Sequence, residues 1–390
     1  MQKREISTIA EKNRIISNII NAMVSRDNFL VLGHQNPDED CLASMIAVAL
    51  LLTKFSKKVE IFASDQLHEH FDYLLSICKF NSIGIARNSH QVGSGIDTII
   101  VCDTPKRSMV SYTDEISEMF SRPEIVKIEV DHHLQADSEY IGDPDFCLVD
   151  EASSACELVG LISLKMQERT ELLEQHQVVD LLSRNFVLAV LTGIIGDTNM
   201  GKFIKSRRER RFYEIFSNMF NELLSRKTKK GSNFSNKDEV FHELHRLSAK
   251  EEECFNYMMA RKQFSDSIGY SILTAEDMRY LHSRFDRDTI VSVARATADA
   301  LAEASGILSL VVYNDDTEGD GLVQFRARRS QDFRDFDLRK ILSIFGIENG
   351  GGHQGAIGFR VEQSRIGNLT EYVGMIVSGI ENALRDATRV

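Results

Sequence analysis

The chain has 390 residues, of which 43% are hydrophobic and 27% charged, a composition typical of a soluble globular protein long enough for two domains. Its net charge of −12 argues against a protein that binds long duplex nucleic acid on a broad basic face. No apolar run approaches the ~20 residues of a membrane helix and no apolar signal core is visible, so we expect a cytoplasmic protein without a membrane partner.

The first half of the sequence alternates strand-like and helix-like segments. An amphipathic helix is predicted over residues 5–23, and the apolar run at 41–55 has helical periodicity. Short strands are predicted at 29–32, 59–63, 97–102 and 124–130. Strands that alternate with helices indicate a parallel sheet covered by helices, and hence an α/β domain over residues 1–204.

The second half changes character twice. Residues 205–262 are polar and helix-prone, so we expect a helical linker there, with its basic run at 205–211 on a solvated face. A linker of this kind is compatible with a homodimer. A smaller α/β domain is predicted over 263–390, with strands at 270–273, 307–313 and 321–329, a helix at 289–304, a turn at 350–353 and a C-terminal helix.

Histidines and carboxylates follow three of the strands predicted in the first domain. In chain order these residues are His34, Asp38, Asp40, Asp103, Asp131, His132 and His133. Because the carboxyl ends of parallel strands meet at one edge of a sheet, we expect the side chains to converge there, with Asp197 as a further contributor. Each one alone has an ordinary explanation, such as helix capping, but their joint occurrence favours a site.

This combination of donors points to divalent metal ions. Imidazole and carboxylate groups without a thiolate suit Mn²⁺ first, with Mg²⁺, Co²⁺ or Fe²⁺ as alternatives. The donors are numerous enough for two ions, which together can lower the pKa of a bound water and neutralise a phosphate.

The motifs GHQNPDED, VCDTP, DHH, GIIGDT and GGGH occur in this order between Gly33 and Phe359. Their succession resembles the DHH phosphoesterase family, in the group that carries a DHH-associated C-terminal domain. The layout is most similar to the nanoRNase (oligoribonuclease) and phosphoadenosine-phosphate phosphatase subgroup. This resemblance implies a DHH metal-binding catalytic domain, a linker and a substrate-binding domain, with the active site in the cleft between the two domains.

The resemblance also implies a role for each candidate residue. The first metal would be held by His34, Asp38 and Asp103, and the second by Asp40, Asp103, His132 and Asp197. Asp103 would then bridge the two ions, Asp131 would orient a histidine, and His133 would face the substrate phosphate. Substrate contacts in the C-terminal domain would come from Arg326, Arg328, Gly350, Gly351, Gly352 and His353. The family often has serine after the first arginine, where Ala327 stands here.

The predicted activity is Mn²⁺-dependent cleavage of short oligonucleotides or dinucleotides such as pApA to mononucleotides. The same site would suit removal of the 3′-phosphate from 3′-phosphoadenosine 5′-phosphate. Two alternatives remain open, a cyclic-dinucleotide phosphodiesterase and a non-catalytic nucleotide-binding regulatory module. A pyrophosphatase and a long-chain exonuclease share the metal motifs and are further alternatives within the family.

Overall fold

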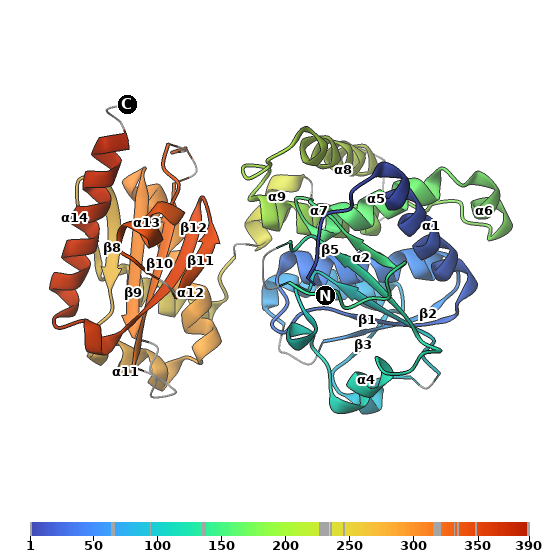
Figure 1. Cartoon of the computed structure of the whole chain (residues 1–390), viewed down its shortest axis with the longest axis horizontal. Coiled ribbons are helices and arrows are strands. Elements are labelled where there is room, and N and C mark those ends of the chain that lie inside the picture. The colour runs from blue at the N-terminus through green and yellow to red at the C-terminus, as the bar shows by residue number, and fades with distance from the viewer. Residues whose placement is uncertain are drawn as a thin grey trace. The chain divides into compact units, whose positions relative to one another are not determined.

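A computed structural model gives the structure of the chain in two compact units, Met1–Arg246 and Leu247–Val390 (Figure 1). It describes residues 2–63, 67–93, 95–134, 138–225, 234, 236–244, 246–314, 321–330, 332–333, 335–347 and 349–387. Among these residues no helix combines the length and apolar character needed to cross a membrane.

The first unit is built on a parallel sheet of six strands in the order β3-β2-β1-β4-β5-β6. The strands are β1 (Asn28–Leu32), β2 (Lys58–Phe62), β3 (Gly84–Ala86), β4 (Thr98–Cys102), β5 (Val126–Asp131) and β6 (Cys147–Val149). The predicted parallel sheet is therefore confirmed. Strands β3 and β6 were not predicted, because three residues are too few to show a periodic pattern. The strand order reverses between β1 and β4, which is where open α/β sheets form a ligand crevice.

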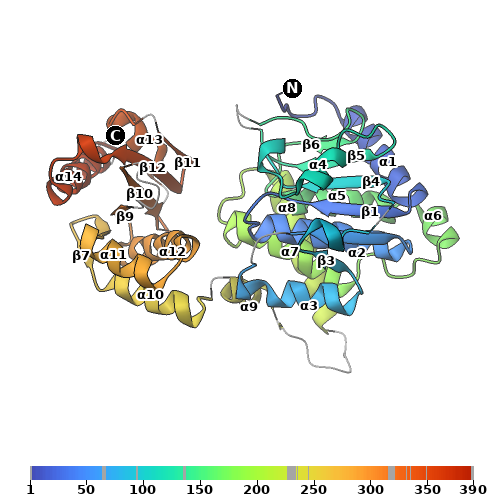
Figure 2. The ribbon, with the colours of Figure 1, turned by 90° about the horizontal axis from the view of Figure 1, so that it is seen from below.

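Helices cover both faces of this sheet. They are α1 (Ile9–Ser25), α2 (Glu39–Lys54), α3 (Asp72–Phe80), α4 (Asp114–Met119), α5 (Ala155–Gln167), α6 (Thr170–Gln175), α7 (Arg184–Thr198), α8 (Arg207–Ser225) and α9 (Lys237–Leu244). Helices α1, α2, α5 and α7 contribute to the core on one face, and α4 packs on the other (Figures 1 and 2). Helix α2 is apolar nearly all round because it is buried on all sides.

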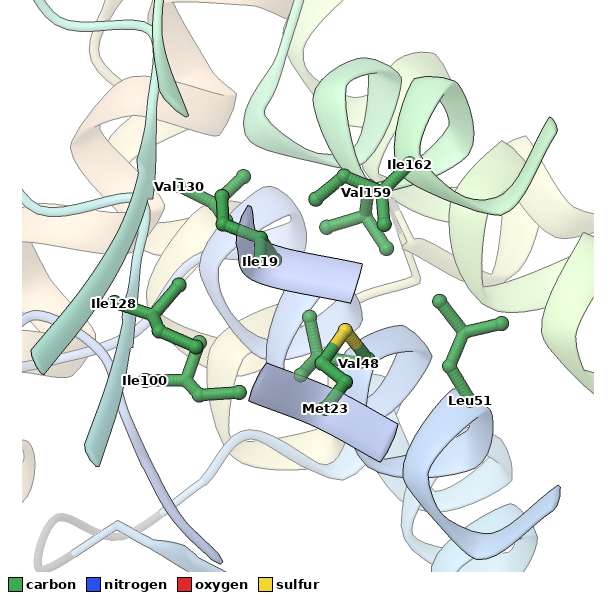
Figure 3. Close-up of a pocket in the computed structure, with 9 residues that line it drawn as sticks. All are labelled: Ile19, Met23, Val48, Leu51, Ile100, Ile128, Val130, Val159 and Ile162. Atoms are coloured by element: carbon green, nitrogen blue, oxygen red, sulfur yellow. The ribbon is translucent and has the colours of Figure 1, made fainter. Parts of the chain in front are cut away.

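The core of the first unit contains a small cavity of about 10 Å³ (Figure 3). Its lining residues are Ile19, Met23, Val48, Leu51, Ile100, Ile128, Val130, Val159 and Ile162. A space of this size barely holds one water molecule, and its apolar walls offer that water no hydrogen-bond partner. The cavity is thus a feature of core packing and not a ligand site.

Helix α8 lies inside the segment expected to be a linker, yet it packs into the core of the first unit. Phe212, Phe216 and Phe220 recur every four residues on one face of the helix and are buried. The boundary between the units falls after Arg246, so the helix that follows, α10, belongs to the second unit. The many charged residues between the phenylalanines hide this apolar stripe when the segment is judged by composition.

The second unit contains a mixed sheet in the order β11-β12-β10-β9-β8-β7, covered on both faces. Its strands are β7 (Lys262–Phe264), β8 (Ile268–Ile272), β9 (Leu308–Asn314), β10 (Leu322–Arg329), β11 (Gly350–His353) and β12 (Ala356–Glu362). Its helices are α10 (Ala249–Met259), α11 (Ala275–Arg284), α12 (Arg287–Ser305), α13 (Arg339–Ile344) and α14 (Leu369–Ala387). Helices α10, α11 and α12 pack on one face, and α13 and α14 pack on the other.

The glycine segment predicted as a turn is instead the edge strand β11, which pairs antiparallel with β12. A Cβ on Gly350 would lie 2.7 Å from the Cβ of Phe359, and one on Gly352 would lie 2.2 Å from the carbonyl oxygen of Ala356. Gly352 also has a φ of 136°, which side chains disfavour. Glycine is needed here because it lets two strands approach closely, and the turn itself lies at 354–355.

Candidate metal centre

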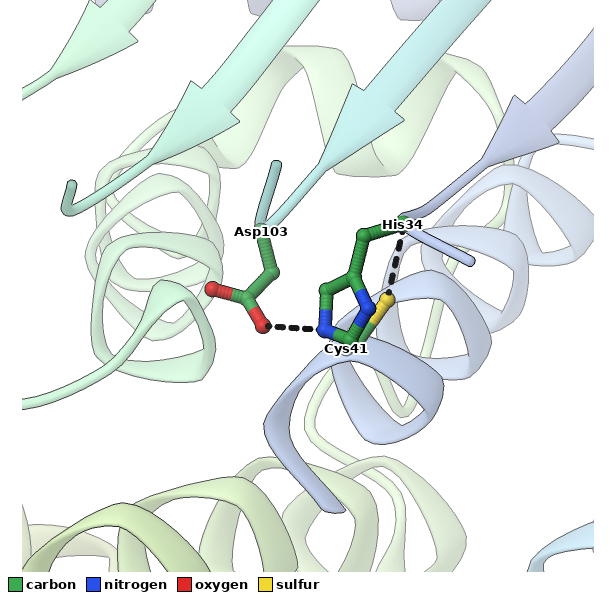
Figure 4. A group of neighbouring side chains, drawn as sticks. All are labelled: His34, Cys41 and Asp103. Atoms are coloured by element: carbon green, nitrogen blue, oxygen red, sulfur yellow. Dashed lines mark hydrogen bonds and ion pairs between the residues drawn. The ribbon is translucent and has the colours of Figure 1, made fainter. Parts of the chain in front are cut away.

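Two strand ends place the first pair of donors at the reversal of strand order. His34 follows β1 and Asp103 follows β4, and Figure 4 shows their side chains facing each other. The Nε2 atom of His34 lies 3.7 Å from Oδ2 of Asp103 and 3.6 Å from Oδ1 of Asp38. Asp38 is also the N-cap of α2, where it accepts a hydrogen bond from the backbone N–H of Cys41. The helix-capping explanation therefore holds for Asp38 and coexists with its place in this cluster.

A second cluster forms around His132, directly after β5. Its Nε2 atom lies 3.3 Å from Oδ1 of Asp103, 3.3 Å from Oδ2 of Asp197 and 3.9 Å from Oδ2 of Asp40. The two oxygens of Asp103 thus point to different clusters, Oδ2 toward His34 and Oδ1 toward His132. All six residues expected to hold metals lie together in the first unit.

Asp103 has a left-handed backbone conformation that is unfavourable for a residue with a side chain. Its φ of 48° is left-handed, which for a residue with a side chain costs about 1–3 kcal/mol. Its backbone N–H donates to the carbonyl oxygen of Val130 at 3.0 Å. Its Oδ1 is buried and has no hydrogen-bond partner among the described residues. The groups that face this oxygen are the imidazoles of His132, at 3.3 Å, and His133, at 3.6 Å. A buried carboxylate oxygen needs a positive charge or a donor beside it, so this atom fits a metal ligand.

Asp40 is oriented by the N-terminus of α5. Its Oδ2 accepts a hydrogen bond from the N–H of Ala155 at 2.5 Å, and its Oδ1 accepts one from the N–H of Cys156 at 2.9 Å. Burial, followed by the charge of Asp103, raises the pKa of Asp40 to about 7. The carboxyl group is therefore fixed in place while it readily holds a proton when no cation is near.

The pKa values of His34, His132 and Asp197 are also raised in the metal-free centre. Burial alone would lower the pKa of both His34 and His132, but the neighbouring carboxylates of Asp38 and Asp103, respectively, raise both well above the ordinary value. Burial and the charge of Asp40 raise the pKa of Asp197. Protons thus occupy the positions where a divalent ion would provide the positive charge, which is consistent with a cation site.

The histidine next in the chain, His133, is bound to Asp131. Its Nδ1 lies 2.7 Å from Oδ1 of Asp131, and its backbone N–H donates to Oδ2 at 3.2 Å. Burial would raise the pKa of Asp131, but the bond from His133 and the charge of Lys3 lower it to about 2. The carboxylate is therefore ionised and able to orient the imidazole ring.

One thiol lies closer to the centre than the sequence suggested. Sγ of Cys41 belongs to a group with His34 and Asp103 whose candidate ligand atoms are within 4.8 Å of one another (Figure 4). The backbone N–H of His34 donates to this sulfur at 3.3 Å. Burial raises the pKa of Cys41 to about 12, so the sulfur stays a neutral thiol. The donor set thus keeps its imidazole and carboxylate character.

Arg208 supports the centre from a distance, although its basic run was expected on a solvated face. Its Nη1 lies 3.0 Å from Oδ2 of Asp150, and its Nε lies 3.1 Å from Oε1 of Glu157. Both carboxylates are buried and flank the start of α5, whose amides hold Asp40. The sequence offered no signal for these pairs, because their members lie more than fifty residues apart.

Gly193 allows the position of Asp40 to be tested without changing any candidate ligand. A Cβ at this position of α7 would lie 2.4 Å from Oδ1 of Asp40 and 2.4 Å from Sγ of Cys156. We expect Gly193→Ala to displace Asp40 and to weaken divalent-ion binding about 10- to 100-fold, as loss of an outer support does. Isothermal titration of the metal-free protein with Mn²⁺ measures this.

Gly374→Ala in α14 is the matched control, since nothing lies within 4 Å of its added Cβ. Alanine there should leave ion binding unchanged and keep or raise the Tm, because glycine inside a helix costs ~0.5–1 kcal/mol. Equal ion affinities in the two variants would show that Gly193 does not govern the position of Asp40.

The candidate substrate residues lie together in the second unit. Arg326 and Arg328 share one face of β10, and Gly358 of β12 is opposite Arg326. A Cβ on Gly358 would lie 2.4 Å from Nη1 of Arg326, so this glycine makes room for the guanidinium group. Gly358 in turn pairs with Gly351 of β11. The side chain of His353 is outside the described part of the structure.

The two arginines differ in how they are paired. Nε of Arg328 lies 3.1 Å from Oδ1 of Asp299 in α12, so its charge is neutralised within the unit. Nε of Arg326 is buried and has no hydrogen-bond partner among the described residues. Of the two, Arg326 has the donor that an anionic ligand would satisfy.

Residues 28–194 match the profile of the DHH family, N-terminal domain. No curated protein matches the chain. Its fold is similar to that of an exopolyphosphatase-related protein from Bacteroides fragilis, with a TM-score of 0.64 and 17% identity over 96% of this chain and 98% of the other. At this identity the similarity establishes a shared fold.

Two weaker structural similarities accompany it. RecJ from Thermus thermophilus in complex with Mn²⁺ has a TM-score of 0.44 and 13% identity, over 99% of this chain and 56% of RecJ. The pGpG-specific phosphodiesterase PggH from Vibrio cholerae has a TM-score of 0.34 and 13% identity, over 91% of this chain and 99% of PggH.

Proposed function

Residues 28–194 form a DHH family N-terminal domain, and from this we propose that the chain is a two-metal phosphoesterase that hydrolyses short oligonucleotides or dinucleotides to mononucleotides. One observation carries the proposal: Oδ1 and Oδ2 of Asp103 point to two separate clusters of imidazole and carboxylate donors. A carboxylate placed in this way suits the bridging position between two divalent ions.

We assign the ligands as follows. One ion would be held by His34, Asp38 and Asp103, and the other by Asp40, Asp103, His132 and Asp197. When bound, the ions would lower the pKa of a water nucleophile and neutralise the charge of the phosphate. Mn²⁺ is the preferred ion for this mixed donor set.

The chain's own groups then handle the substrate. His133, whose ring is oriented by Asp131, would face the reacting phosphate. Arg326 would bind a second, non-reacting phosphate, with the backbone of Gly351 and Gly352 beside it. His353 and Arg328 would add contacts to the same phosphate.

A short substrate fits these features better than a long one. The net charge of −12 leaves little capacity to hold many backbone phosphates, and of the two candidate substrate arginines only Arg326 keeps a buried donor without a partner among the described residues. The complete donor set argues against a non-catalytic regulatory module. 3′-Phosphoadenosine 5′-phosphate and cyclic dinucleotides are the alternatives of matching chemistry.

The test is hydrolysis with Mn²⁺ across pApA, a long single-stranded RNA, 3′-phosphoadenosine 5′-phosphate, cyclic di-AMP and pyrophosphate. We expect pApA to yield AMP far faster than the long RNA yields any mononucleotide. The Asp103→Asn protein, purified in parallel, controls for contaminating nucleases. Preference for pyrophosphate, cyclic di-AMP or the long RNA would refute the proposal of a short linear substrate. No turnover of any of these compounds despite bound metal would refute the proposal that the protein is an enzyme.

A further inference from the structure

Lys3 is a buried lysine whose ammonium group lies directly behind the candidate metal centre. Its side chain is 0% exposed. Its Nζ lies 2.5 Å from Oδ2 of Asp131, 2.8 Å from Oε1 of Glu129 and 2.6 Å from the carbonyl oxygen of Thr104. Lysine is almost never fully buried unless it is paired, and here the ammonium donates hydrogen bonds to Asp131 and Thr104 and forms an ion pair with Glu129.

The segment that precedes α1 delivers this side chain. The backbone N–H of Lys3 donates to the carbonyl oxygen of Ser138 at 3.2 Å, and Gln2 forms a β-bridge with Glu139. The N–H of Arg4 donates to the hydroxyl oxygen of Tyr140 at 3.2 Å. The segment is therefore fastened to the residues that come shortly after the Asp-His-His motif, and the position of Lys3 is defined by its backbone.

The ammonium joins the ends of two strands that carry candidate ligands. Thr104 follows Asp103 at the end of β4, and Asp131 precedes His132 at the end of β5. The other oxygen of Asp131, Oδ1, accepts from Nδ1 of His133. A continuous chain of contacts thus runs from Lys3 through Asp131 to the imidazole of His133.

Neutralising Glu129 does not by itself explain this arrangement. Oε2 of Glu129 already accepts hydrogen bonds from the N–H groups of Ile141 and Gly142, at 2.8 and 3.0 Å. The shorter contact of Lys3 is the one to Asp131, at 2.5 Å against 2.8 Å for Glu129. The ammonium is thus placed to fix the carboxylate that faces the site.

We propose that Lys3 is a positioning residue of the phosphoesterase site. It fixes the carboxylate of Asp131 so that Oδ1 accepts from Nδ1–H of His133, and this sets both the orientation of the ring and its tautomer. Nε2 of His133 is then the atom left for the substrate. This inference rests on the proposed function for its catalytic consequence, but the tautomer of His133 is measurable without any substrate.

Two variants separate positioning from stability. Lys3→Met leaves two buried carboxylates without a counter-charge, so its Tm should fall. Lys3→Met/Glu129→Gln removes one of the two negative charges and should recover much of the Tm, while Asp131 still lacks its ammonium partner. If the single variant fails to fold, the double variant carries the test.

Three readouts apply: the Tm of the metal-free and Mn²⁺-loaded proteins, the ¹H–¹⁵N long-range spectrum of His133 in the metal-free protein, assigned with His133→Gln, and kcat and KM on the dinucleotide with Mn²⁺. The wild type should show a single Nδ1–H tautomer, and both Lys3 variants a mixture. In the double variant kcat should fall about 10- to 100-fold, as for other outer partners of a metal site, with little change in KM.

A double variant that regains the single tautomer and full kcat together with its Tm would overturn the proposal, because Lys3 would then be only structural. The proposed function fails in a different way: the wild type would turn over no phosphate ester, whereas the change of tautomer between wild type and variants would remain and support positioning by Lys3.

Discussion

Asp103→Asn is expected to abolish hydrolysis and to remove the high-affinity binding of both divalent ions. The substitution keeps the size of the side chain but takes away the negative charge and one of the two oxygens that face the His34 and His132 clusters. The loss of kcat/KM should exceed the ~10–100-fold that removal of an outer partner costs. Metal content after dialysis and turnover of the dinucleotide measure the two effects.

Asp197→Asn provides the comparison, because Asp197 belongs to the cluster around His132 and Asp40. That variant should retain about one ion per chain and lose activity through the other site. The bridging role of Asp103 would be wrong if Asp103→Asn kept two ions and normal turnover, or if it lost one ion in the same way as Asp197→Asn.

Divalent-ion affinity is expected to rise steeply with pH. The pKa of Asp40 is raised to about 7, and those of His34 and His132 lie well above the ordinary value, so the metal-free centre holds protons that an incoming ion must displace. Each displaced proton increases the apparent association constant about tenfold per pH unit below the pKa concerned. Calorimetric titrations in two buffers of different ionisation enthalpy count the protons released.

The same pKa shifts determine whether the stability of the metal-free protein rises or falls with pH. These groups bind protons more tightly in the folded than in the unfolded chain, so their contribution to the free energy of unfolding is present at low pH and is lost as pH rises. For Asp40 this contribution to stability is lost between pH 3.8 and about pH 7. For His34 and His132 the loss begins above pH 6.5. Asp131, whose pKa is lowered to about 2, contributes equally throughout this range.

The Tm of the metal-free protein should therefore fall between about pH 6 and pH 8, and added Mn²⁺ should raise it more at the higher pH. Thermal unfolding followed by circular dichroism, with and without Mn²⁺, tests both parts. An affinity that does not change with pH, or a metal-free Tm that rises over this range, would contradict the proton occupancy that we infer for the centre.

Local pattern was enough to predict several elements of the first unit. The apolar run at 41–55 forms α2, and the strands predicted at 29–32 and 97–102 are β1 and β4. Periodicity and strand ends are properties of a few consecutive residues, so they are visible without knowledge of the partners. The convergence of the candidate ligands followed as well, because parallel strands bring their carboxyl ends to one edge.

The predictions from sequence pattern were wrong where one residue type serves more than one structural role. The glycines at 350–352 were expected in a turn and instead allow β11 to approach β12 closely. The charged segment around α8 was expected in a linker and instead buries three phenylalanines in the core. Composition cannot distinguish these uses, since a glycine or an apolar stripe gains its meaning from the element packed against it.

The sequence by itself thus determined β1, β4, α2 and the chain order of the candidate ligands, because these depend on neighbours along the chain. Only the tertiary structure decided that the two oxygens of Asp103 face different clusters and that Asp40 is held by an amide 115 residues away. It also decided that Lys3 reaches Asp131 across 128 residues. Such contacts depend on which helix and which terminal segment pack beside the sheet, and that choice is made by the free energy of the whole fold rather than by local preference.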